Sequence, residues 1–219
     1  MSLPRYLTGQ PVPESPNPSF SVRGRRQLLA DFPYTAAGLR LPGRDGKAVF
    51  LWLGLFCVWV LLIPTALAVW MEAPLVFPPL ASSALMVCAQ STRLNATPRA
   101  VILGHGCGIV AGLTVVVGMG MLEQGDTITT LNPKHAAAGL VSIVLCVLAM
   151  ALVGVAHAPA LSTALTVGLG LVAGLDHVLV LLAGAIVLPY CAAPVHRLAG
   201  VPYPWWSPPL NSGGDDART

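Results

Sequence analysis

The residues best suited to chemistry in this sequence are hydroxyls and histidines that lie inside apolar segments. Ser82 and Ser83 closely follow a proline pair, and Ser162 and Thr163 closely follow a proline in a similar segment. Hydroxyls donate hydrogen bonds, and the first turn of a helix adds unpaired N–H groups and a positive dipole end. Two such helix starts predict a substrate-binding site for a small anion, with Ser82 and Ser162 facing one another across it and Ser83 and Thr163 contributing less. The alternative is that each hydroxyl bonds its own helix or a neighbouring one.

A histidine and an arginine add to these candidates. His105 lies between Gly104 and Gly106 in the middle of an apolar run, where a titratable group is a functional candidate by default. It could equally be a packed, hydrogen-bonded histidine. Arg99 begins the same run, and it either extends to the membrane surface or attracts the anion as a gate.

A second group of residues suggests proton coupling or gating. His157 precedes the second hydroxyl pair, and Asp176 with His177 is the acidic pair closest to an apolar segment. A solvated turn would also explain Asp176 and His177. A haem protein with axial ligands among the histidines is a further alternative, with four candidates: His105, His135, His157 and His177.

Composition places the chain in a membrane. Hydrophobic residues make up 55% of the 219 residues and charged residues 10%, whereas soluble domains carry about 25% charged residues. The mean hydropathy is +0.73. The five cysteines lack metal-site spacing, and no phosphate loop, nucleophile elbow or paired carboxylates are present. We therefore expect no catalytic residue, no metal, no cofactor and no nucleic-acid partner.

The apolar segments predict an all-α, polytopic transmembrane helical bundle of about six segments. Four have lengths close to a membrane span, and two shorter ones begin near proline, which is well tolerated in the first turn of a helix. The four are Val49–Trp70, Ala100–Leu122, Ala136–Ala156 and Leu175–Tyr190, and the two short ones begin after Pro79 and Pro159.

The two short segments match at a constant offset, which predicts an internal repeat. Ser83 aligns with Thr163, and the same offset aligns Gly104 with Gly184. Three segments per repeat place the halves in opposite orientations, as an inverted 3+3 repeat. With the basic N-terminal tail inside, six crossings return the C-terminus to the same side.

Several motifs resemble the HPP family of small integral membrane proteins. The stretch from Thr97 to His105, TPRAVILGH, is similar to the family's Pro-Arg-x-Val-Ile-x-Gly-His, and the segment from His157 stands where the family has His-Pro-Pro. The naming motif differs here, because Ala158 replaces its first proline. Plant and cyanobacterial members are associated with nitrite transport. The resemblance implies a transporter-like fold more firmly than it implies nitrite.

These observations predict a domain plan and a function. Residues 1–47 form a disordered, basic, proline-rich tail, residues 48–190 form the transmembrane domain with halves at 48–123 and 135–190, and residues 191–219 form a C-terminal tail. We expect a transporter or channel for a small inorganic anion, in the bacterial cell membrane or, alternatively, the chloroplast envelope. The alternative function is a non-transporting scaffold. Glycine-rich helix faces would allow a homo-oligomer.

Overall fold

The structure is a computed structural model, and it describes residues 46–72, 77–91, 93–121, 132–172, 174–199, 201 and 203–207. The described residues form helices and contain no strand. In chain order the elements are α3 (Gly46–Trp70), α4 (Phe77–Ala89), the 3-10 turn η3 (Leu94–Ala96), α5 (Pro98–Gly118), α6 (Pro133–Val153), α7 (Pro159–Gly168) and α8 (Leu175–Leu198). The all-α prediction is confirmed.

Helix length divides these elements into two kinds. Helices α3, α5, α6 and α8 are long and apolar enough to cross a membrane. Helix α4 has 13 residues and α7 has 10, so at about 1.5 Å per residue neither spans a hydrocarbon layer of about 30 Å. The predicted bundle with two short helices is therefore confirmed.

Helices α5 and α6 begin slightly earlier than the apolar segments predicted, at Pro98 and Pro133, because a polar residue caps each start. Thr97 accepts a hydrogen bond from the Ala100 N–H, and Pro98 occupies the first helical position of α5. Asn132 accepts from the His135 N–H in the same way at the start of α6. Polar caps and first-turn prolines are invisible to an apolar count, which explains the difference.

The last helix is longer than predicted. Helix α8 continues past Tyr190 to Leu198 with Pro189 and Pro194 inside it. The predicted boundary at residue 190 is therefore too early, and the predicted C-terminal tail begins within a helix. Proline removes one backbone donor, but neighbouring helices keep such interruptions helical in a membrane bundle.

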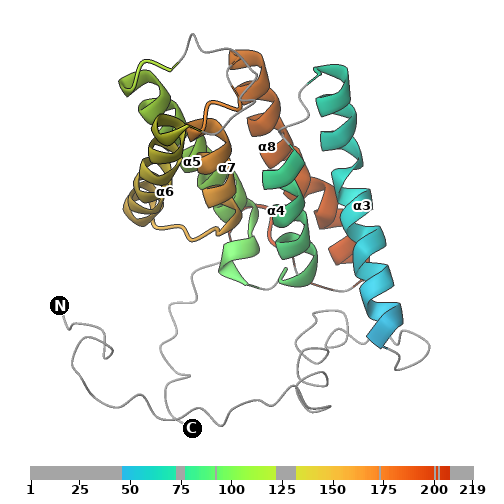
Figure 1. The fold of residues 1–219 in the computed structure, drawn as a ribbon. Coiled ribbons are helices and arrows are strands. Elements are labelled where there is room, and N and C mark those ends of the chain that lie inside the picture. The colour runs from blue at the N-terminus through green and yellow to red at the C-terminus, as the bar shows by residue number, and fades with distance from the viewer. Residues whose placement is uncertain are drawn as a thin grey trace, which may run out of the picture.

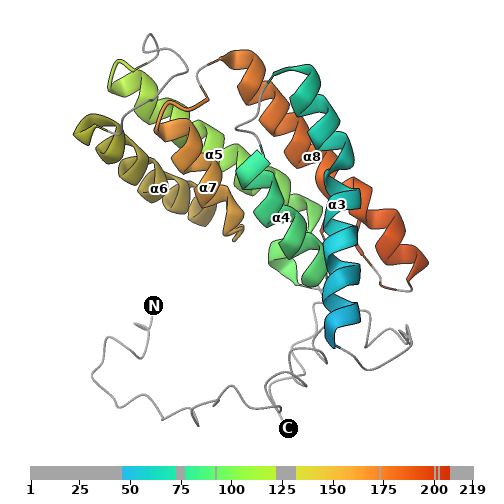
Figure 2. The same cartoon turned by 45° about the vertical axis from the view of Figure 1, so that its right-hand side comes forward.

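The helices form two groups, one of three consecutive helices and one that joins the last helix to the first two. Successive helices run in opposite directions, with α3, α5 and α7 pointing one way and α4, α6 and α8 the other (Figure 1). Helix α5 packs with α6 and α7, whereas α8 packs with α3 and α4. The two groups meet at α4 and α7, which lie side by side in Figure 2 and are in contact.

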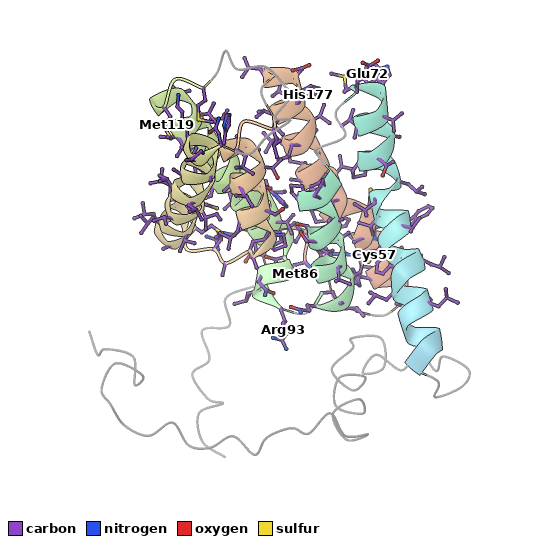
Figure 3. All side chains as sticks on the ribbon, in the orientation of Figure 1. Cys57, Glu72, Met86, Arg93, Met119 and His177 are labelled. Atoms are coloured by element: carbon purple, nitrogen blue, oxygen red, sulfur yellow. The ribbon has the colours of Figure 1, made fainter. Side chains whose placement is uncertain are left out.

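The two ends of the bundle differ in charge. Glu72 and His177 lie at one end, and Arg93 lies at the other, the end where α3 begins (Figure 3). The predicted disordered tail, apart from residues 46 and 47 in α3, lies outside the described residues, as does the loop that carries Glu123 and Asp126.

Candidate functional site

The candidate site lies where the two short helices meet. Ser83 in the second turn of α4 and Thr163 in α7 are both 0% exposed. His105 of α5 joins them, because its Nε2 lies 2.7 Å from Ser83 Oγ and its Nδ1 lies 2.6 Å from Thr163 Oγ1. One imidazole thus connects the two hydroxyls that the sequence aligned.

A second histidine extends the cluster toward the η3 turn. His157, just before α7, places its Nε2 2.9 Å from Ser83 Oγ and its Nδ1 2.9 Å from the Asn95 carbonyl oxygen. The ring centroids of His105 and His157 are 5.2 Å apart. Both histidines are buried. We call this hydrogen-bonded set, from Thr163 through His105, Ser83 and His157 to the Asn95 carbonyl, the polar chain.

One carbonyl sets the direction of every hydrogen bond in the polar chain when both rings are neutral. The Asn95 carbonyl can only accept, so His157 carries its proton on Nδ1 and accepts at Nε2. Ser83 therefore donates its hydroxyl proton to His157 and accepts from the Nε2–H of His105. His105 is then left with an acceptor at Nδ1, to which Thr163 donates. The contact from Ser83 Oγ to the Pro79 carbonyl is longer, at 3.3 Å.

Glycines of α5 make room for this arrangement. A Cβ atom added at Gly104 would lie 2.7 Å from His157 Cβ, and one added at Gly108 would lie 2.6 Å from the Ala160 carbonyl oxygen. Side chains at either position would push α7 away and separate Thr163 from His105. The glycine face that could have served an oligomer is therefore occupied by α7 of the same chain.

The other hydroxyls lie outside the polar chain. Ser82 is exposed, and its Oγ donates to the Pro79 carbonyl at 2.9 Å. Ser162 is half-buried beside Thr163. The sequence-based prediction favoured Ser82 and Ser162, whereas the structure brings Ser83 and Thr163 together through His105.

The charged candidates occupy other places. The guanidinium of Arg99 donates to the Val153 carbonyl at 3.1 Å and so caps the last turn of α6. Asp176 is exposed and His177 half-buried in the first turn of α8, and neither contributes a hydrogen bond to the polar chain. Proton coupling by this pair remains a prediction.

The segment after α8 forms a strap along the same end of the bundle as Asn95. Tyr203, which is buried, donates its hydroxyl to the Ala96 carbonyl at 2.9 Å, and burial raises the pKa of this hydroxyl above its usual range. The Arg99 N–H donates to the Trp206 carbonyl at 2.9 Å. The sequence-based prediction assigned this segment to the C-terminal tail.

Among the described residues, no group of three or more His, Cys, Asp or Glu side chains could hold a metal ion. Both ring nitrogens of His105 and of His157 are engaged in hydrogen bonds. Neither ring offers a nitrogen to haem iron in this arrangement.

Sequence reasoning missed the role of Asn95, because it is the backbone carbonyl that accepts the hydrogen bond and every residue type carries one.

Long apolar helices and a buried polar chain at the crossing of two short ones define a helical integral membrane protein. The family model "HPP, transmembrane region" matches residues 43–204, which is well over half of the chain. The chain belongs to the HPP transmembrane family, as its sequence motifs indicated. No curated protein and no solved structure matches it.

Proposed function

We propose that this protein carries a small inorganic anion across the membrane, with nitrite as the first candidate, and that the polar chain is part of its binding site. The observation that carries the proposal is the polar chain itself. Two imidazoles and two hydroxyls are buried inside a bundle whose interior is otherwise packed with hydrophobic side chains. Buried polar groups in a membrane interior are expensive, and they are kept where a substrate or ion must be bound.

The packing of the helices supports an inverted repeat. If α3, α4 and α5 are exchanged with α6, α7 and α8, the pairs of helices that contact each other stay the same. The contact between α5 and α7 becomes the one between α8 and α4, and the contact between α4 and α7 maps onto itself. Paired helices of the two halves also run in opposite directions (Figure 1). A substrate site at such a repeat interface is the arrangement of many transporters.

Within this proposal, the site centres on Ser83 and Thr163 rather than on Ser82 and Ser162. Ser83 and Thr163 align in the repeat, are fully buried and share His105. An anion that reaches them would take hydrogen bonds from the hydroxyls or from a ring N–H. The bacterial cell membrane is the proposed location, with the Arg93 end of the bundle on the cytoplasmic side.

Flux in liposomes tests the proposal, with adjacent serines as a matched pair. Wild-type protein should transport at least one of nitrite, nitrate, formate or chloride. Ser83→Ala should reduce binding and flux about ten- to a hundred-fold, because a hydrogen bond to a charged partner contributes about 1.5–3 kcal/mol. Ser82→Ala should stay close to wild type.

Two outcomes would contradict the proposal. A folded wild-type protein that moves none of these anions, especially one that co-purifies with a partner, would favour the scaffold function. If Ser82→Ala impairs flux more than Ser83→Ala does, the exposed serine and not the polar chain contacts the anion. Circular dichroism and yield in detergent show whether each variant is folded.

A further inference from the structure

We infer that the polar chain is also a proton site, and that the anion crosses the membrane together with a proton held on His105 or His157. This inference rests on the proposed anion transport and specifies its co-ion. Four hydrogen bonds between 2.6 and 2.9 Å link two hydroxyls, two imidazoles and one carbonyl without a break. Such a chain can accept one proton and move the resulting charge along it.

The proton balance of the chain is simple. An added proton binds Nδ1 of His105 while the Thr163 hydroxyl rotates away. The Nε2–H of His105 then passes to Ser83 Oγ, as the original Ser83 proton passes to Nε2 of His157. One proton has entered, Ser83 is again a neutral hydroxyl, His105 is again neutral, and His157 carries the positive charge.

The Asn95 carbonyl makes one end of this chain fixed. Because it only accepts, His157 keeps its Nδ1–H whether the ring is neutral or charged. The mobile proton is therefore the one between His157 Nε2 and Ser83, at 2.9 Å. This proton leaves His157 through Ser83 and His105, and these are the residues at which the anion is proposed to bind.

The surroundings explain why the proton needs the anion. A charged imidazole buried without a partner is strongly destabilised, and both carboxylates among the described residues, those of Glu72 and Asp176, are exposed. The other titratable or charged side chains on the elements around the polar chain are Cys88, Arg93, Arg99, Cys107, Lys134, His135, Cys146, Asp176, His177, Tyr190, Cys191, His196, Arg197 and Tyr203. None of these described side chains supplies a buried negative charge, and in this proposal the transported anion supplies it.

Binding of the two ions is therefore mutually favourable. A proton on the polar chain attracts the anion, and the bound anion stabilises the charged imidazole, so each raises the affinity of the other. Together they add no net charge to the apolar interior. Transport of a monovalent anion should then be electroneutral, at about one proton per anion.

The test measures proton and anion flux in the same liposomes. A pH-sensitive dye inside reports protons while an imposed nitrate or nitrite gradient drives transport, and protein-free liposomes correct for passive leak of the free acid. Wild type should show about one proton per anion and no response to a membrane potential set with potassium and valinomycin. Ser83→Ala should lower the proton-to-anion ratio of the remaining flux, and Ser83→Thr, which keeps the hydroxyl, should restore it.

The outcomes separate the two proposals. Anion flux that responds to the membrane potential and carries no proton overturns the proton site and leaves anion transport standing. Absence of any anion flux overturns both. A wild-type ratio that persists in Ser83→Ala also overturns the proton site. If Ser83→Ala does not fold, Thr163→Val, which has nearly the same shape, is measured in its place with the same expected fall in the ratio.

Discussion

The interface between α5 and α7 and the interface between α8 and α4 have the same place in the proposed repeat but different side chains. On α5, three glycines face α7, and added Cβ atoms there would lie within 2.7 Å of atoms of the other helix or the turn before it. On α8, one glycine is followed by larger residues at the matching positions. The α5 positions are Gly104, Gly108 and Gly112, and the α8 positions are Gly184, Leu188 and Ala192.

The difference shows how one architecture gives two kinds of interior. At α5 the missing side chains let α7 approach closely, and the space opposite Gly104 is filled by the His157 side chain. At α8 the space opposite Gly184 is filled by Leu80, which is apolar and buried. The polar chain therefore lies mainly at the interface of α5 and α7, and the α8–α4 side of the proposed repeat supplies apolar packing plus one hydroxyl, Ser83.

The largest loss of stability at the interface of α5 and α7 is expected from a substitution at Gly108. In Gly108→Ala the new Cβ would lie 2.6 Å from the Ala160 carbonyl oxygen, which is backbone and cannot rotate away. We expect a loss of about 2–3 kcal/mol and a fall in Tm of about 5–10 °C, measured by thermal unfolding in detergent. Gly106→Ala is the control, since its Cβ would meet nothing within 4 Å. Equal Tm values for the two variants would show that α5 and α7 are not closely packed.

A smaller change in stability, with a large change in function, is expected at Gly104. The Cβ of Gly104→Ala would lie 2.7 Å from His157 Cβ and 3.3 Å from two of its ring atoms. His157 must then shift away from Ser83, so we expect flux to fall about ten-fold or more. The free energy of unfolding should fall by only about 1–2 kcal/mol. The measurement is liposome flux at matched protein density. Normal flux in a folded Gly104→Ala protein would remove His157 from the site.

The smallest effect is expected at the matching position of the other half. In Gly184→Ala the Cβ would lie 2.5 Å from Leu80 Cδ1, the end of a flexible side chain that can change its rotamer. Alanine also favours helix over glycine by about 1 kcal/mol, which offsets the crowding. Flux and Tm should both stay near wild type. A loss of flux as large as that of Gly104→Ala would mean that the two interfaces are functionally equivalent, contrary to the comparison.

Much of the fold could be predicted because membrane helices follow from hydropathy along the chain. Four long segments and two short ones were visible as apolar runs, and the prolines near Pro79 and Pro159 marked the short helices. The end of α8 was not visible. Pro189 and Pro194 predict a helix end in water, whereas packing against α3 and α4 keeps the helix continuous to Leu198.

The candidate site could be predicted by residue type but not by connection. His105, Ser83, Thr163 and His157 were all candidates before the structure, because polar groups inside apolar segments are conspicuous. The sequence-based preference for Ser82 and Ser162 over Ser83 and Thr163 differs from the arrangement in the structure, since one residue rotates the helix by about 100° and only the neighbouring helices decide which side is buried.

The sequence by itself determined the membrane class, the HPP family resemblance, the short helices and the set of polar residues, because each depends on residue type and local order. The tertiary structure decided which polar residues meet. His105 and Thr163 are far apart in the chain, as are His157 and Asn95, and only the packing of α5 against α7 brings each pair within hydrogen-bond distance. The direction of the polar chain depends on a backbone carbonyl, which every residue carries and only the fold can place.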